Sequence, residues 1–336
     1  MVLLSALVLA TLGLAVRHNG AAGAFPLIAF FIFQSMGTQA KTLPRLAFAI
    51  GGGIFCTLLV FAGAKQISTW MVDVPKYFWR VGAMYDIAGT SYQEKKYLFS
   101  AEIFSGNSLE DVDKLYSPRS VLPLESGVQI HTLPGQPVKQ GKSFDVRELK
   151  VSLNQRLFSN WVEAIVHHPR AYLKHRYDVF VSLVTRSPWG LWAPVWESIV
   201  PNDLGMVDRP LTKSAYFDDV RSLASQQSVI FVPLLYLTLC AIAFIPTLIF
   251  GLRFHNDALL LASALYGSGL AHMAGLFFVV HTADFRYSHW MIVATTLGTG
   301  FVLLESARAI WKFAVLGSSA IIFKEKWLHK SGHLEN

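Results

Sequence analysis

Apolar residues lie in long runs that alternate with one long polar stretch. Six runs contain no Asp, Glu, Lys or Arg: residues 2–16, 21–37, 46–64, 229–252, 259–280 and 290–304. An apolar run of about 17–25 residues predicts a helix that crosses a membrane, and the first and last runs fall slightly short of that length. The pattern therefore predicts an α-helical integral membrane protein with about six transmembrane helices.

The polar stretch between the third and fourth runs is long enough to fold as a domain. The expected organisation is three N-terminal transmembrane helices in residues 1–64 and a large α+β insert in residues 65–226. Three further transmembrane helices follow in residues 227–306, and a basic tail occupies residues 307–336. Residues 310–323 are apolar apart from Lys312, and we expect them to lie on the membrane surface.

The insert shows mixed local signals. Residues 92–104 favour a helix, whereas several prolines and glycines in residues 117–144 predict turns and short strands. Residues 146–153 alternate weakly, as a strand does. Residues 155–184 are apolar on one side and basic on the other, with a break at Pro169, which is typical of helices at a membrane surface.

Three tryptophans follow at the spacing of one helical face: Trp189, Trp192 and Trp196. Tryptophan is enriched at membrane–water interfaces, so an aromatic belt is the simpler interpretation. Indole faces also stack on sugar rings, and a sugar platform is the alternative.

The charge distribution argues against nucleic acid and predicts an orientation. The net charge is +7, but residues 65–226 hold 19 basic and 17 acidic residues, so most of the excess lies at helix ends and in the tail. Basic residues concentrate on the cytoplasmic side of membrane proteins. With the insert outside, eight of the ten basic residues beyond it are cytoplasmic: Lys41, Arg45, Arg253, Arg308, Lys312, Lys324, Lys326 and Lys330. We therefore expect an exoplasmic insert. The insert contains no cysteine, which is compatible with a bacterial inner-membrane protein whose insert faces the periplasm or exterior.

Polar residues gather between the fifth and sixth apolar runs, in a loop expected on the same side as the insert. His281, Asp284, Arg286 and Tyr287 lie close together there. Arginine presents a planar fork that suits phosphate, although an Asp284–Arg286 pair that only closes a helical hairpin explains the same residues. His167, His168 and His175 do not have the spacing of a zinc site, and no metal site is predicted.

Four short segments resemble bacterial membrane glycosyltransferases of the GT-C superfamily. DFRYSHWMIV (284–293) is similar to the D-x-R-Y segment that begins a late helix, and HHPRAYLKHR (167–176) is similar to an H-P-x-A-Y-L-x-H-R stretch. YDIAGTSYQ (85–93) resembles a D-L-A-G segment, and RHNGAAGAFPL (17–27) resembles an R-H-N motif followed by proline. Members carry their catalytic carboxylate in a first outer loop, and this chain begins later. The chain is therefore expected to be the C-terminal portion of such a protein.

The resemblance implies transfer of a sugar from a polyprenyl-phosphate carrier to a cell-surface acceptor within the membrane. No cofactor is expected, apart from a divalent cation as an option. Arg286 would hold the carrier phosphate with Tyr287, Asp284, His281, Arg17 and His18, and Asp86 is the candidate catalytic base. The alternative is a non-catalytic membrane component that exports, flips or scaffolds surface polysaccharide.

Overall fold

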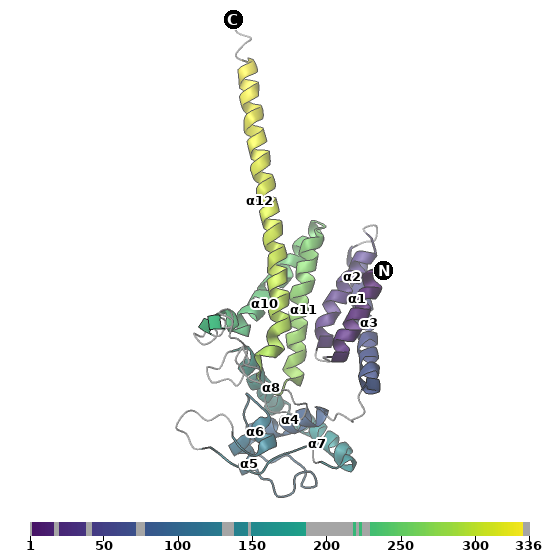
Figure 1. Cartoon of the computed structure of the whole chain (residues 1–336), viewed down its shortest axis with the longest axis vertical. Coiled ribbons are helices and arrows are strands. Elements are labelled where there is room, and N and C mark those ends of the chain that lie inside the picture. The colour runs from purple at the N-terminus through teal and green to yellow at the C-terminus, as the bar shows by residue number, and fades with distance from the viewer. Residues whose placement is uncertain are drawn as a thin grey trace.

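The structure is a computed structural model, and it describes residues 2–16, 20–37, 42–71, 78–129, 138–146, 149–185, 218–219, 222–223 and 229–331. Long helices form a bundle, and shorter helices gather at one end of it (Figure 1). The bundle contains α1 (Val2–Val16), α2 (Ala21–Ser35), α3 (Thr42–Met71), α10 (Pro233–Arg253), α11 (Asp257–Val279) and α12 (His289–Ser331). The shorter helices are α4 (Phe78–Glu94), α5 (Leu109–Leu115), α6 (Leu122–Ser126), α7 (Asn154–His167) and α8 (Pro169–Val184). Single 3₁₀ turns are η2 (Val151–Leu153), η3 (Val229–Phe231) and η4 (Phe285–Ser288).

Each predicted apolar run is helical over most of its length, which confirms the α-helical class and is consistent with an integral membrane protein. The helices α3, α10 and α11 and the segment Phe285–Lys312 are long and apolar enough to cross a membrane. The helices α1 and α2 have 15 residues each, or about 22 Å. That length is less than the roughly 30 Å hydrocarbon core, so the crossing of these two helices stays a prediction.

Small residues bring the bundle helices close together. A Cβ atom added at Gly53 of α3 would lie 2.8 Å from the Cβ of Ala29 in α2. The small-residue face of α11 also packs within the chain, since Gly275 approaches Ala22 of α2 and Gly267 approaches Phe244 of α10. Small side chains allow this approach of helix backbones, which substitutes for the hydrophobic driving force that lipid does not provide.

The helix α12 is continuous from His289 to Ser331 and projects beyond the rest of the bundle (Figure 1). Its 43 residues correspond to about 65 Å. No turn separates residues 310–323 from the preceding span, so they continue α12, and their place on the membrane surface stays a prediction. The last apolar run ends at residue 304, well before the end of the helix. An apolar run indicates the part of a helix that contacts lipid and does not indicate where the helix ends.

The short helices do not form the α+β domain that the sequence predicted. Among the described residues of the insert, β-type pairing is limited to two isolated bridges, Ser120 with Thr282 and Val128 with Gln140. The predicted strand at residues 146–153 is wrong, because Val151–Leu153 form the η2 turn that leads into α7. The prediction for residues 155–184 is confirmed in its secondary structure, since α7 and α8 meet at Pro169.

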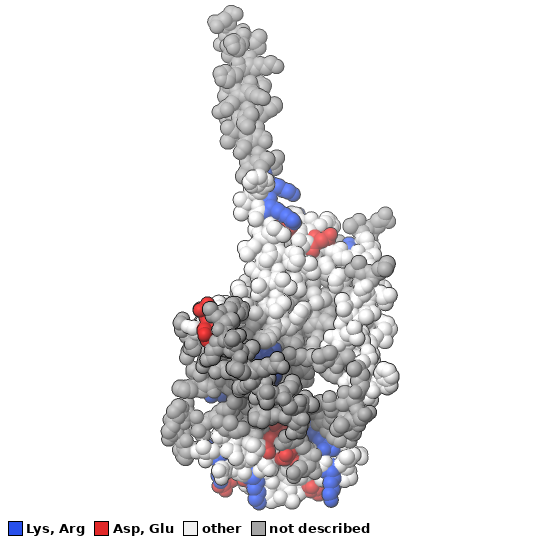
Figure 2. All heavy atoms as spheres, viewed as in Figure 1, with Lys and Arg blue, Asp and Glu red and all other residues white. Residues whose placement is uncertain are grey.

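Charged residues are concentrated at the two ends of the bundle. On the face in Figure 2, most of the described Lys, Arg, Asp and Glu side chains gather over the short helices and near the opposite end, where α12 begins to project; a red group at the left edge and a few blue atoms near the centre lie between these zones. The described surface between these zones is largely uncharged, as expected for a lipid-facing band.

Candidate functional site

A buried network of polar side chains connects α4 to α7 and α8. The Asp86 carboxylate lies 2.6 Å from Arg176 Nη2 and 3.2 Å from His175 Nε2, and it accepts a 2.8 Å hydrogen bond from Trp161 Nε1. The side chains of Asp86 and His175 are fully buried and that of Arg176 is nearly so. A buried charge is stable only when it is paired and hydrogen-bonded, and Asp86 has both a guanidinium partner and neutral donors.

The histidine of this network is best described as neutral. Burial lowers the pKa of His175 below its usual value and outweighs the raising effect of Asp86. Burial raises the pKa of Tyr116 far above its usual value, so its hydroxyl keeps its proton. That hydroxyl lies 2.9 Å from His175 Nδ1. Tyr116 therefore donates to Nδ1, and Nε2–H of His175 donates to Asp86.

A glycine in α4 makes room for the histidine. A Cβ atom at Gly89 would lie 2.0 Å from His175 Nδ1, so no larger residue fits there without displacing the ring. Asp86 and Gly89 are three residues apart on one face of α4, and both contact the same imidazole. The spacing D-x-x-G in YDIAGTSYQ thus has a physical cause in this structure.

The same network connects α8 to the α11–α12 loop, which comprises residues 280–288. Arg176 Nη1 donates a 2.8 Å hydrogen bond to the carbonyl of Val280. The main chain adds two contacts to the segment before α6, because Val121 N donates to His281 O and Ala283 N donates to Arg119 O. The short helices are therefore docked on this loop through residues that are more than 100 positions apart.

The loop contains the candidate phosphate-binding residues. Asp284 is buried and caps η4 by accepting from the backbone N–H of Arg286. It also pairs with the Arg286 guanidinium, whose side chain is 62% exposed. Burial lowers the pKa of His281, so its imidazole is neutral near pH 7. The pair predicted between Asp284 and Arg286 is confirmed, and Arg286 still presents its charge at the surface.

The segment RHNGAAGAFPL (17–27) contacts α11 and the start of α12 through Gly23, near the beginning of α2. A Cβ atom at Gly23 would lie 3.1 Å from Trp290 Nε1 and 3.3 Å from the Cβ of His272. Trp290 Nε1 donates to Ser268 Oγ, and Ser268 Oγ donates to the carbonyl of Gly23. His272 Nε2 donates to the carbonyl of Tyr287. All four resembling segments thus belong to one connected set of contacts.

Several predicted site residues lie outside the described residues. These are Arg17 and His18, and the tryptophans Trp189, Trp192 and Trp196. The three histidines that were weighed as metal ligands have different partners: His168 approaches Glu94 at 3.5 Å, His167 contacts the carbonyl of Glu163, and His175 belongs to the buried network.

Sequence reasoning singled out Asp86 but missed its partners. Arg176, Trp161 and Tyr116 were not proposed as site residues, and His175 was considered only for zinc. The one signal that points to Arg176 is its place at the end of HHPRAYLKHR, since a pairing across 90 positions leaves no trace in local periodicity.

Comparison with known proteins adds no relative to this description. No protein-family model, curated protein or solved structure matches the chain.

Proposed function

We propose that the chain is a membrane glycosyltransferase, or a portion of one, that uses a polyprenyl-phosphate-linked sugar as donor. The observation that supports this is the convergence of the four resembling segments. Direct contacts join the four segments. Asp86 of α4 pairs with Arg176 of α8, which binds the carbonyl of Val280 in the loop. His272 binds the carbonyl of Tyr287 in the same loop and lies against Gly23 of α2. Segments that are far apart in the sequence therefore meet at one end of the bundle.

In this proposal Arg286 binds the carrier phosphate. Its guanidinium is exposed beside the first turn of α12, at the start of the candidate span Phe285–Lys312. Tyr287 and the neutral His281 lie in the same loop and supply hydrogen-bonding groups. Asp284 orients Arg286, since its buried carboxylate binds both the backbone N–H and the guanidinium of that residue.

Asp86 is less suited to act directly on substrate in this conformation. Its side chain is fully buried and is engaged by Arg176, His175 and Trp161. A general base must reach the proton that it removes, directly or through one water molecule. The catalytic role of Asp86 stays a prediction, and phosphate binding at Arg286 does not depend on it.

The burial of Asp86 also favours the second candidate function. A chain that binds a polyprenyl-phosphate glycan without transferring it would serve as a non-catalytic component for export, flipping or scaffolding of surface polysaccharide. The two functions share the phosphate site and differ in turnover, so one experiment on binding and transfer separates them.

The test compares donor binding by the wild type, Arg286→Lys and Arg286→Ala. Lysine keeps the charge but not the planar fork, so both variants should bind a purified polyprenyl-phosphate sugar more weakly. Loss of a charged hydrogen bond, worth about 1.5–3 kcal/mol, corresponds to a roughly ten- to hundred-fold weaker affinity. Transfer to an added acceptor is measured in the same samples and decides between enzyme and carrier protein.

Arg156→Lys is the matched control. Arg156 of α7 forms an exposed two-point pair with Glu102, and an exposed pair of this kind contributes about 0–1 kcal/mol. Equal donor affinity in the wild type, both Arg286 variants and this control would leave Arg286 as a hairpin residue and remove the phosphate site.

A further inference from the structure

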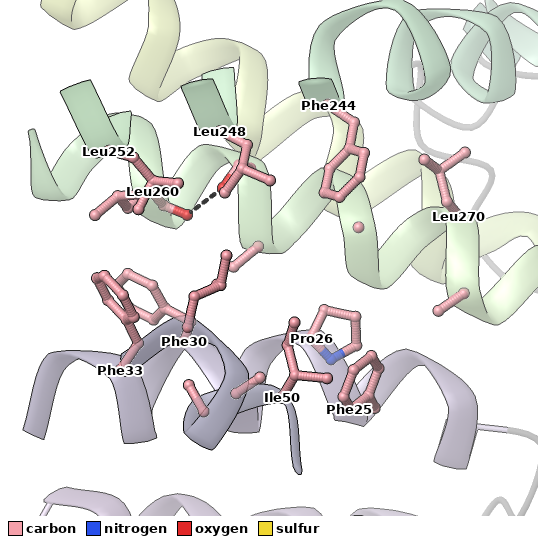
Figure 3. A pocket seen from close by; sticks show the side chains of 17 residues that line it. Phe25, Pro26, Phe30, Phe33, Ile50, Phe244, Leu248, Leu252, Leu260 and Leu270 are labelled. Carbon is pink, nitrogen blue, oxygen red and sulfur yellow. Dashed lines mark hydrogen bonds between the residues drawn. The ribbon is translucent and has the colours of Figure 1, made fainter. Parts of the chain in front are cut away.

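An apolar cavity of about 280 Å³ lies between the N-terminal and C-terminal halves of the bundle. In Figure 3, side chains of α2 enter it from one side and those of α10 and α11 from the other. Phe25, Pro26 and Phe30 of α2 face Phe244 and Leu248 of α10 across this space. The single hydroxyl in the lining, that of Ser263, is bonded to the carbonyl of Leu260, so the wall offers a ligand hydrocarbon contacts.

A smaller polar pocket adjoins the cavity, at the end of the bundle that is remote from α4–α8. This second space of about 140 Å³ shares Phe33, Leu252 and Leu260 with the apolar cavity. Its remaining lining is polar or charged and includes Gln34, Thr42, Arg45, His255 and Asp257. An apolar cavity and a charged pocket therefore lie next to each other in the bundle, and the pocket forms the mouth of the proposed site.

Arg45 is built into the junction between the two parts. It is only 7% exposed, although it is a cation near the end of a membrane helix. Its Nε and Nη2 atoms donate to the carbonyl of Phe33, and its guanidinium lies 3.8 Å from the centre of the Phe33 ring. These contacts hold the guanidinium in place where Arg45 lines the polar pocket. Gln34 orients Asp257 on the other side through a 2.8 Å hydrogen bond.

We propose that this site binds one phospholipid molecule, with a hydrocarbon chain in the apolar cavity and the head-group phosphate at Arg45. An apolar cavity of roughly 150 Å³ already binds benzene, so the larger space here accommodates part of an acyl chain. An acyl chain in this space makes dispersion contacts with the apolar lining atoms, and a bilayer around the helices supplies such chains.

The charges at the mouth favour a zwitterionic head group. Arg45 carries a positive charge and Asp257 a negative one, which matches a phosphate followed by an amine, as in phosphatidylethanolamine. An anionic head group would pair with Arg45 and be repelled by Asp257. This lipid is distinct from the sugar donor, because its head group lies at the opposite end of the bundle from Arg286.

The decisive variant is Ala264→Phe, which fills the cavity from α11. Native mass spectrometry of the full chain in detergent, with added palmitoyl-oleoyl phosphatidylethanolamine, should show one lipid bound to the wild type. Ala264→Phe should lower the bound fraction at least tenfold. Ala274→Phe is the matched control, because Ala274 lies on the same helix but is exposed and does not line the cavity, and it should retain the lipid. Equal lipid retention by Ala264→Phe and the wild type overturns the proposal.

A second measurement needs no variant and separates a lipid from a free anion. Delipidated wild type should gain thermal stability when the phospholipid is added and should not respond to inorganic phosphate at the same concentration. Stabilisation by inorganic phosphate equal to that by the lipid, or no stabilisation by the lipid, overturns the proposal. No arm contains a sugar donor, so these outcomes are independent of the proposed transferase function.

Discussion

At the scale of single residues, Gly89 and His175 determine how closely α4 and α8 approach. The imidazole is held by Asp86 on one side and by Tyr116 on the other, so it cannot move away from an added methyl group. The glycine is therefore required by its neighbour, whereas glycine in a helix interior is otherwise unfavourable by roughly 0.5–1 kcal/mol.

Gly89→Ala should reduce stability by about 1–3 kcal/mol or more, because the new Cβ atom overlaps the His175 ring. Gly82→Ala in the same helix is the control. A Cβ atom at Gly82 meets nothing within 4 Å, so this change should leave stability unchanged or raise it by about 0.5–1 kcal/mol. Thermal unfolding of both variants in detergent tests the difference, and equal effects would contradict the packing described for Gly89.

The Asp86–Arg176 pair is the second residue-scale feature. Removal of one partner from a buried pair leaves the other charge uncompensated, at a cost of about 3–5 kcal/mol. Replacement of both partners by neutral residues of similar size avoids this cost. The pair is therefore expected to show strong coupling in a double-mutant cycle.

Asp86→Asn and Arg176→Met should each destabilise the protein by about 3–5 kcal/mol, and the double variant by much less than their sum. Unfolding midpoints of the four proteins measure the coupling. Sugar transfer by the folded double variant then reports on Asp86 separately from stability. Retention of transfer would exclude Asp86 as the catalytic base, and additive stability losses would contradict the buried ion pair.

At the scale of elements, α7 and α8 use their surfaces differently from the prediction. The sequence suggested that both present a basic face to water. In α8, however, His175 and Arg176 are buried against α4 and the α11–α12 loop. The helix α7 retains an exposed apolar stripe of Phe158, Val162 and Val166, next to a polar stripe that includes Ser159.

The apolar stripe of α7 should lie against lipid. In a variant without native cysteines, a fluorophore at Val166→Cys should be quenched by nitroxide-labelled lipids in nanodiscs. The same fluorophore at Ser159→Cys should be quenched by an aqueous agent instead. Cys56 and Cys240 can be replaced for this purpose, since both lie inside the bundle helices α3 and α10. Preferential aqueous quenching at Val166 would place α7 away from the membrane.

The positions of the bundle helices could be predicted from sequence, but their ends and the fold of the insert could not. Apolar runs mark contact with lipid, so they identified all six bundle helices. They missed the last turns of α3, which continue past Lys65 as far as Met71. The prolines and glycines in residues 117–144 suggested short strands, but a strand forms only when it pairs with another strand. Ser120 pairs with Thr282 as an isolated bridge, and no strand results among the described residues. That partner lies in the last loop and is invisible to local patterns.

At the scale of the whole molecule, the site and the two charged ends determine how the protein is oriented. The α11–α12 loop lies beside the short helices, and the continuous α12 carries the tail to the opposite end of the bundle. The tail and the insert are therefore expected on opposite sides of the membrane. The distribution of basic residues outside the insert, eight to two, predicts that the tail is cytoplasmic.

A topology reporter fused after Gly141 should be active only on the outer side, and one fused after Lys330 only in the cytoplasm. Substituted-cysteine labelling in intact cells gives an independent measurement. If the reporters after Gly141 and Lys330 are found on the same side, α12 does not pass through the membrane. A cytoplasmic signal at Gly141 would reverse the proposed orientation.

The docking of the short helices on the α11–α12 loop has a consequence for biosynthesis. Arg176 is made 104 residues before Val280, whose carbonyl it binds. At about 5–20 residues per second, synthesis of that interval takes roughly 5–20 s. During this time the emerged insert lacks its acceptor at Val280 and its main-chain partners at His281 and Ala283. The α4–α8 unit can therefore reach its final structure only after the last hairpin has entered the membrane, and an unfinished chain exposes it to the proteases and chaperones of the compartment that receives it.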